Sequence, residues 1–394
     1  MMENFEYYNP VKVVFGAGTV RQIGQHAALY GKKALIATYQ DCSFFAEILE
    51  TIHRDLAANG VASIDYPNIT ANPLLSQAEQ GVAVCRADKI DVIIALGGGS
   101  VMDCAKIIAA GVKYPHPLEK MIMFSHSCPK TIPPRQALPT VMVPTLPGTG
   151  SEMNPTAVIT DEATGRKSYV WEPSCLYAKT ALLDPDLTVS LPPYQTACGA
   201  FDIVAHVLEA YLNGDPAVNL ELQERMQEGV VKAVLAVLPQ VWSNPGDVQA
   251  RGVMMWAASI ALNGWLTSGT FTFTPMHQMG HVLSARYHAA HGATLACMMP
   301  AWFRYFAGRP DNGKYIQMAE RLFGASLPEA ADRLEKRMRQ YGIQTRLSQF
   351  GVQPAELDAL TDIVVEVSFG PDHRLSGHPP MTRQDIRAIY ELAL

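Results

Sequence analysis

Short aliphatic and β-branched runs alternate with longer amphipathic segments between residues 10 and 112. This alternation is typical of βαβ units, which build a mostly parallel sheet. The run from Asp91 to Leu96 is apolar throughout after its first residue, which predicts a strand buried on both faces. Strands are predicted at 11–15, 34–37 and 91–96, and a helix at 44–59.

The pattern changes twice beyond residue 133. It is first rich in β signals between Gly and Pro turns, and strands are predicted at 137–144, 157–160 and 181–184. Leu191-Pro192-Pro193 then marks a break, after which nearly every segment to Leu394 has helical spacing. The sequence therefore predicts two domains, an α/β domain over 1–188 and a helical domain over 189–394.

Composition narrows the class of protein. A chain of 394 residues that is 48% hydrophobic can bury a large core and favours two domains. The net charge of -6, without a basic block, argues against nucleic acid or an anionic membrane as a partner. The apolar stretch 253–266 is too short to span a bilayer. The N-terminus has no signal-peptide pattern, and seven scattered cysteines without Cys-x-x-Cys predict reduced thiols in a cytoplasmic protein.

A triple glycine, Gly97-Gly98-Gly99, followed by Ser100, stands between the predicted buried strand and a helix. Such a turn lets the backbone approach an anion and points free N–H groups and the helix dipole at it, so it predicts a pyrophosphate site. The alternative is a tight turn that only packs strand against helix. Two further loops at strand ends, 145–152 and Asn72-Pro73, favour a nucleotide, because open α/β sheets bind ligands at that edge.

Histidines and one aspartate recur at helical spacing in the second half. Asp202 and His206 are four residues apart, so both can face one ion from the same side of a helix. His277 and His281 repeat that spacing, and His291 follows ten residues later. A lone histidine on an apolar face is more often structural, but five such groups together predict a metal site. Nitrogen-rich ligation suits Fe²⁺ or Zn²⁺ rather than Ca²⁺ or Mg²⁺.

Together these motifs resemble those of the iron-containing (group III) alcohol dehydrogenases, over essentially the whole chain. Within that family they are most similar to the branch of NADPH-dependent aldehyde reductases and butanol dehydrogenases. The resemblance rests on 97–106, on 145–152, on the Asp202-x-x-x-His206 pair and on the histidines from His277 to His291. It implies a Rossmann-like dinucleotide-binding domain and an all-α metal-binding domain in a dehydroquinate synthase-like fold, with the active site in the cleft between them.

The resemblance also implies roles for individual residues. One divalent metal, Fe²⁺ or Zn²⁺, would be held by Asp202, His206, His277 and His291, and His281 would be a non-ligand histidine that transfers a proton. The implied cofactor contacts are Asn72, Gly97, Gly98, Gly99, Ser100, Asp103, Thr145, Thr149, Lys167 and Leu183.

The segment after the second predicted strand bears on the choice between the two nicotinamide cofactors. Tyr39 and Ser43 resemble the branch that leaves room for a 2′-phosphate, which makes both residues candidate cofactor contacts. Asp41 would repel that phosphate if its side chain points inward. The sequence thus favours NADP(H) over NAD(H), with both kept open.

The expected reaction is reversible hydride transfer between nicotinamide and a small, uncharged primary alcohol or aldehyde. Only Arg286 is charged between 252 and 303, and Trp265, Phe271 and Phe273 are candidate walls of the substrate pocket. Two alternatives remain: a related metal- and NAD-dependent enzyme on a phosphorylated polyol or sugar, of the glycerol phosphate dehydrogenase or sugar-phosphate cyclase type, and a metallohydrolase. The resemblance further implies a homodimer that pairs N-terminal strands.

Overall fold

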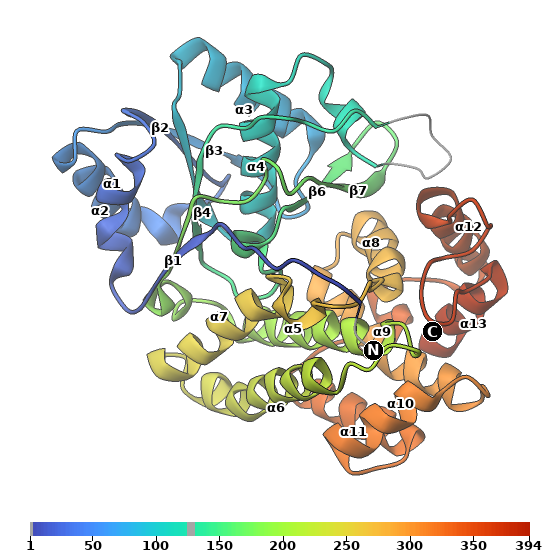
Figure 1. Ribbon diagram of the computed structural model, residues 1–394. Helices are drawn as coiled ribbons and strands as arrows, with labels where there is room; N and C mark the ends of the chain where they lie inside the picture. The colour runs from blue at the N-terminus through green and yellow to red at the C-terminus, as the bar shows by residue number, and fades with distance from the viewer. Residues whose placement is uncertain (1–2, 124–130) are drawn as a thin grey trace.

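The computed structural model describes residues 3–123 and 131–394 (Figure 1). A sheet flanked by helices forms one half of the molecule, and a group of helices forms the other. Cys128 lies outside the described residues, and the six other cysteines are free thiols. Within the described part of the chain, no helix is both long enough and apolar enough to cross a membrane.

Six parallel strands make the main sheet, in the order β1-β8-β5-β4-β2-β3. Gly97 at the end of β4 is in register with Pro144 at the end of β5, so the loops that follow both strands leave the sheet at one edge. The strands are β1 (Lys12–Phe15), β2 (Lys33–Tyr39), β3 (Ala62–Ile69), β4 (Val92–Gly97), β5 (Thr140–Pro144) and β8 (Thr180–Leu183).

Helices cover both faces of this sheet. Alternate residues of β2 belong to two separate apolar clusters, Leu35 to one and Ile36 to the other, which places a core on each face. The predicted strand buried on both faces is confirmed in β4, whose residues are all buried. The helices of this half are α1 (Ile23–Ala27), α2 (Ala46–Ala58), α3 (Leu75–Asp88) and α4 (Gly99–Lys113).

A two-stranded antiparallel hairpin, β6 (Thr156–Asp161) with β7 (Arg166–Trp171), projects from the sheet half. The strand at β6 was expected from the sequence, whereas β7 was not. Strand β7 packs against α8 (Pro275–Tyr287) of the helical half. The hairpin therefore lies at the junction of the two halves (Figure 1).

The second half is helical, as predicted, apart from isolated bridges among residues 369, 375 and 381. Helix α5 lies at its centre and packs on α6 and α9. The last sheet strand ends at Leu183 and the first helix begins at Pro193, while the exact division at 188/189 stays a prediction. The remaining helices are α5 (Pro193–Leu212), α6 (Glu221–Ser243), α7 (Val248–Leu262), α9 (His291–Ala307), α10 (Gly313–Met318), α11 (Leu327–Gln340), α12 (Leu357–Ser368) and α13 (Arg383–Ala393).

Candidate active site

Three helices bring the predicted metal ligands together. Helix α5 carries Asp202 and His206, α8 carries His277, and α9 begins at His291. One ligand atom each from Asp202, His277 and His291 lie within 4.8 Å of one another. Residues that are far apart in the sequence are thus brought together where these three helices meet.

His206 stands beside this trio rather than inside the same short radius. Its ring centroid is 4.2 Å from that of His277. Its Nδ1 donates to the backbone carbonyl of Asp202 at 2.9 Å. A carbonyl only accepts, so the proton is on Nδ1 and the lone pair of Nε2 is left for another partner.

Several polar atoms of this cluster are buried without a hydrogen-bond partner among the described residues. They are Asp202 Oδ1, His277 Nε2 and His291 Nδ1. Buried polar atoms are rarely left unsatisfied, because each costs about 1–3 kcal/mol. A divalent cation would satisfy Asp202 Oδ1 and His277 Nε2, and His291 has its Nε2 at 3.7 Å from Asp202 Oδ1. A carboxylate with imidazoles is the donor set of Fe²⁺ or Zn²⁺. The residues present therefore fit the implied metal.

His281 lies one turn beyond His277 on α8, with its ring centroid 5.2 Å from that of His291. Its Nδ1 is also buried and without a partner among the described residues. Burial, with Lys167 as a further cause, holds the pKa of His281 well below its ordinary value. The imidazole is therefore neutral near neutral pH and can accept a proton only transiently.

Glu209, which was not expected from the sequence, contacts the candidate ligand His277. Its carboxylate accepts hydrogen bonds from His277 Nδ1 and from the backbone N–H of Met276. It lies on α5 seven residues after Asp202 and is 1% exposed. In the sequence, Glu209 could have been found as an acidic residue on the helix face that also carries Asp202 and His206.

Glycines permit the close packing that forms the cluster. A Cβ at Gly292 would lie 2.1 Å from the carbonyl oxygen of Cys198, and one at Gly199 would lie 2.2 Å from that of Pro147. Neither contact tolerates a side chain. Gly292 therefore lets α9 approach α5 beside Asp202, and Gly199 lets the 145–152 loop approach the same helix.

The three loops that the sequence predicts to bind a nucleotide contact one another in the sheet half. A Cβ at Gly98 would lie 2.9 Å from the hydroxyl of Tyr39, and one at Gly99 would lie 2.5 Å from the side chain of Thr149. Asn72 adopts a positive φ of 55° and its backbone N–H donates to Ser100 Oγ at 3.3 Å. The three predicted strand-end loops are thus neighbours at one edge of the sheet.

Lys167 reaches the same place from β7. Its Nζ donates to Asn72 Oδ1 at 2.7 Å and to Ser284 Oγ at 3.3 Å. Burial lowers the pKa of this amine to about 8, although Asp103 and Asp202 act in the opposite direction. The carboxylate of Asp103 accepts from Ser151 Oγ at 2.6 Å and from the backbone of Val158 at 3.0 Å.

Lys106 is the last residue of the glycine-rich motif and was not among the site residues expected from the sequence, but it is buried beside the site. Its Nζ donates to Ser151 Oγ at 2.9 Å and to the backbone carbonyls of Asn154 and Thr156 at 2.8 and 2.7 Å. The amine thus ties α4 to the chain that follows the 145–152 loop. Burial lowers its pKa to about 8.

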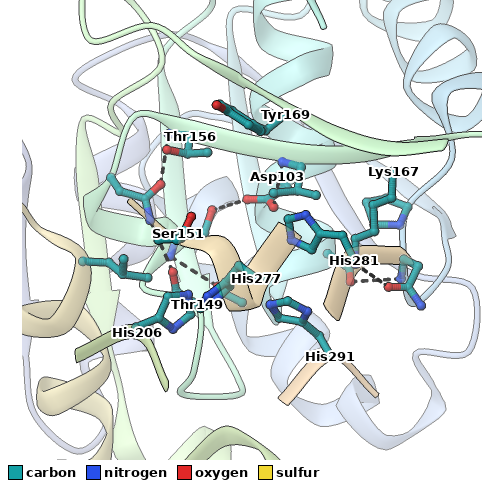
Figure 2. A pocket seen from close by; sticks show the side chains of 18 of the residues that line it. Asp103, Thr149, Ser151, Thr156, Lys167, Tyr169, His206, His277, His281 and His291 are labelled. Atoms are coloured by element: carbon teal, nitrogen blue, oxygen red, sulfur yellow. Dashed lines mark hydrogen bonds between the residues drawn. The ribbon is translucent and has the colours of Figure 1, made fainter. Parts of the chain in front are cut away.

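A cavity of about 300 Å³ is lined by candidate metal ligands together with Lys167 and Asp103. Figure 2 shows these side chains around it. A second cavity of about 240 Å³ adjoins it and is lined by Tyr39 and Gly98. Gly97, Thr145 and Leu183 line neither cavity, and Ser43 lies on the surface with Asp41.

The expected aromatic walls are wrong. Phe271 is 71% exposed and Trp265 is 47% exposed, and neither they nor Phe273 line the described cavity. They follow α7 in a loop that packs partly against the N-terminal segment, as in the contact of Tyr7 with Trp265. The cavity wall on that side is made by Leu262, Thr274 and Gln278.

Comparisons with known proteins agree with this geometry. The chain is 32% identical, over the full length of both proteins, to the probable NADH-dependent butanol dehydrogenase 2 of Bacillus subtilis. It is 28% identical, again over both full lengths, to the NADPH-dependent aldehyde reductase YqhD of Escherichia coli.

Solved structures show the same fold. That of NADH-dependent butanol dehydrogenase A from Thermotoga maritima superposes with a TM-score of 0.91 at 30% identity, covering 100% of this chain and 99% of that one. The family model described as iron-containing alcohol dehydrogenase matches residues 10–185, and that of its C-terminal region matches 196–394. The chain belongs to the iron-containing alcohol dehydrogenase family, whose members are oxidoreductases.

Proposed function

We propose that this chain catalyses reversible hydride transfer between a nicotinamide cofactor and a small primary alcohol or aldehyde at the metal cluster. One observation carries the proposal: the two cavities share a wall made of residues from both motifs. Asn72, Gly99, Ser100 and Thr149 of the nucleotide loops line both cavities, and so does His291 of the metal cluster. A cofactor held by the loops would thus have its reactive end beside the candidate metal ligands.

The metal would be held by Asp202, His206, His277 and His291, and when bound it acts as a Lewis acid toward the substrate oxygen. Lys167 and Asn72 orient the cofactor through their mutual hydrogen bond. Asp103, fixed by Ser151, presents an acceptor to the same cavity. His281 passes the proton between the substrate oxygen and solvent.

On the cofactor, we propose that NAD(H) is used better than NADP(H), which reverses the preference expected from the sequence. Asp41 Oδ1 accepts from Ser43 Oγ at 2.7 Å and from its backbone N–H at 3.2 Å. The serine hydroxyl is therefore engaged by a carboxylate rather than free for a 2′-phosphate. These hydrogen bonds keep the pKa of Asp41 below its ordinary value, so the carboxylate is charged at neutral pH and would repel a 2′-phosphate bound near this segment.

Relatives with both cofactor preferences are similar to this chain, and the first of them are named as NADH-dependent. Butanol dehydrogenases with that name, from Bacillus subtilis and Clostridium acetobutylicum, are 32% and 30% identical to it, and an NADP-dependent alcohol dehydrogenase of Entamoeba histolytica is 30% identical. We infer that small aliphatic aldehydes are substrates, because Leu262, Val158 and Tyr169 give the cavity apolar surface in addition to its polar lining.

The test is to load the purified protein with Fe²⁺ or Zn²⁺ and follow oxidation of NADH or NADPH with butanal. Turnover that a chelator abolishes and that the metal restores is the expected result. Asp41→Gly should improve kcat/KM for NADPH by roughly tenfold, because the substitution removes a charge of the same sign as the 2′-phosphate. Absence of turnover in protein with stoichiometric metal would refute the proposal.

The two alternatives have weaker support. A phosphorylated substrate needs cationic side chains near the metal, and Lys167 is the one Lys or Arg that lines the cavity among the described residues. Asn72 and Ser284 already engage it. A metallohydrolase would leave the nucleotide loops without a role.

We further propose a homodimer that forms at β1. This strand is the outer edge of the sheet and pairs only with β8 among the described residues. A shallow apolar groove lined by Phe15, Val253 and Trp256 runs beside it. Unpaired edge strands with exposed apolar side chains are ready to pair with a second chain.

A further inference from the structure

Helix α5 presents three acidic or imidazole side chains on one face, at positions 202, 206 and 209. The first two are candidate metal ligands, whereas Glu209 points past them to the N-terminus of α8. It is buried and has no cationic side chain among the hydrogen-bond partners described for it. A buried carboxylate without a cationic partner is costly, so its two hydrogen bonds need an explanation.

Each carboxylate oxygen has its own donor. Oε1 accepts from the backbone N–H of Met276 at 2.5 Å, and Oε2 accepts from His277 Nδ1. Helix α8 begins at Pro275, so the N–H of Met276 has no partner inside the helix. Glu209 therefore caps α8 and contacts the first histidine of that helix with the same group.

The contact with His277 identifies the ring nitrogen that faces Glu209. Oε2 is hydrogen-bonded to Nδ1, and burial raises the pKa of Glu209 while the hydrogen bonds from Met276 and His277 lower it. When the carboxylate is ionised beside a bound cation, Nδ1 is the donor and Nε2 presents its lone pair. Nε2 is buried without a hydrogen-bond partner among the described residues. One ring nitrogen of His277 lies within 4.8 Å of ligand atoms of Asp202 and His291. Because Nδ1 is engaged by Glu209, Nε2 is the atom available to that trio.

We propose that Glu209 is a positioning residue that fixes the tautomer and ring orientation of His277 for metal binding; this inference rests on the proposed metal site. Carboxylate–histidine pairs of this kind raise the basicity of the ligand nitrogen. Capping of α8 by the same carboxylate couples the start of the helix to the orientation of its histidine. Glu209 touches neither substrate nor cofactor, so its effect passes through His277.

The experiment compares metal-free wild type with Glu209→Gln and Glu209→Ala. Zn²⁺ affinity is measured by competition with a chromophoric chelator, and the visible spectrum of the Co²⁺-loaded protein reports ligand geometry. We expect affinity to fall by about 10–100-fold in Glu209→Gln, since an amide can donate to Nδ1 and permit the wrong tautomer. Glu209→Ala should bind at least as weakly, and the Co²⁺ spectrum should change in both variants.

Glu228→Gln is the matched control, because Glu228 on α6 is also buried but contacts Arg225, Arg321 and Tyr211 instead of a candidate metal ligand. It should keep wild-type Zn²⁺ affinity and the wild-type Co²⁺ spectrum. The Tm of each metal-free variant separates loss of fold from loss of binding, and the isosteric Gln variant is expected to keep a Tm close to wild type.

Wild-type Zn²⁺ affinity and an unchanged Co²⁺ spectrum in folded Glu209→Gln would overturn the inference and leave Glu209 as a helix cap alone. Failure of the wild-type protein to bind a stoichiometric metal would instead overturn the proposed function. The two failures are therefore distinguished by the wild-type measurement.

Discussion

Burial determines the protonation states of the candidate metal ligands. It lowers the pKa of His277 to about 3 and those of His206 and His291 well below the ordinary value. Neutral imidazoles are the form that binds metal, so the histidines are ready ligands at neutral pH. Burial also raises the pKa of Asp202 to about 7, with Lys167 opposing and Glu209 adding to the rise.

The raised pKa of Asp202 predicts that metal and proton compete for this carboxylate. Metal affinity should therefore strengthen as pH rises through about 7 and weaken below it, as the carboxyl takes up a proton. Chelator competition across this range measures the slope. Asp202→Asn should abolish most of the binding, whereas equal wild-type affinity about one pH unit either side of that value would contradict the prediction.

The two histidines of α8 should respond differently to substitution. His277→Ala should lose the metal and lower kcat/KM by more than about a hundredfold, since loss of an outer-shell partner alone costs 10–100-fold. His281→Gln should keep the metal and lose about 10²–10⁴-fold in kcat, the usual contribution of a proton-transfer group. Metal analysis and steady-state kinetics on both variants decide this; full metal content in His277→Ala would refute the ligand assignment.

The pKa of Lys167 leads us to expect a second pH effect, on the affinity for the cofactor. Its pKa, lowered to about 8 by burial, means that the amine loses its charge as pH rises through that value. Affinity for the anionic cofactor should fall over the same range, because the cation that attracts it disappears. Fluorescence titration of NADH against pH measures this, and Lys167→Met should bind more weakly at neutral pH and show a flatter profile.

Spacing alone could predict only part of the site at the residue scale. The Asp202–His206 and His277–His281 pairs are visible because i and i+4 share a helix face. Glu209 is not, since a glutamate within a helix is ordinary until the structure shows it buried behind a histidine. Lys167 came from the resemblance to the family, because nothing in its local sequence shows that β7 reaches the cavity.

At the scale of elements, strands were predicted correctly where a continuous apolar run marked them. They were missed where the local sequence contained residues that disfavour a strand or gave no clear pattern. The buried strands β4 and β5 have continuous apolar runs and were expected. Strand β3 contains Asp65 and Pro67, which disfavour a strand, and it is tolerated because β3 is the outer strand of the sheet. Strand β7 exists through its pairing with β6, which local pattern does not reveal.

Contact between α5 and α9 depends on Gly292. A methyl group there would lie 2.1 Å from the carbonyl oxygen of Cys198, so Gly292→Ala must push the helices apart. We expect a loss of about 1–3 kcal/mol in the free energy of unfolding together with weaker metal binding.

The matched control for that substitution is Gly229→Ala on α6. Gly229 is in a helix, and a Cβ there meets nothing within 4 Å. Its replacement should raise the free energy of unfolding by about 0.5–1 kcal/mol, because alanine is the better helix former. Urea denaturation measures both variants, and equal stability changes of the same sign would contradict the packing argument.

At the scale of the molecule, the active site is made by the junction of the two halves. Each half supplies an incomplete set: loops and Lys167 from the sheet half, metal ligands from the helical half. The glycine-rich loops and the metal ligands could be predicted from motifs in the sequence and Lys167 from the family resemblance, but the cavity wall depends on how the halves meet. The expected aromatic walls failed for this reason, while Leu262 and Gln278, unremarkable in sequence, line the cavity. Cytoplasmic location stays a prediction.

The same scale contains the last prediction, which concerns the edge at β1. Phe15 is 48% exposed and Trp256 is 40% exposed, with ring centroids 6.3 Å apart, so pairing two β1 strands would bury both rings. Sedimentation should show a wild-type dimer and a Phe15→Glu monomer, because the substitution places like charges at the interface. Leu222→Glu, at a residue 64% exposed and outside the groove, should stay dimeric. A monomeric wild type would refute the interface.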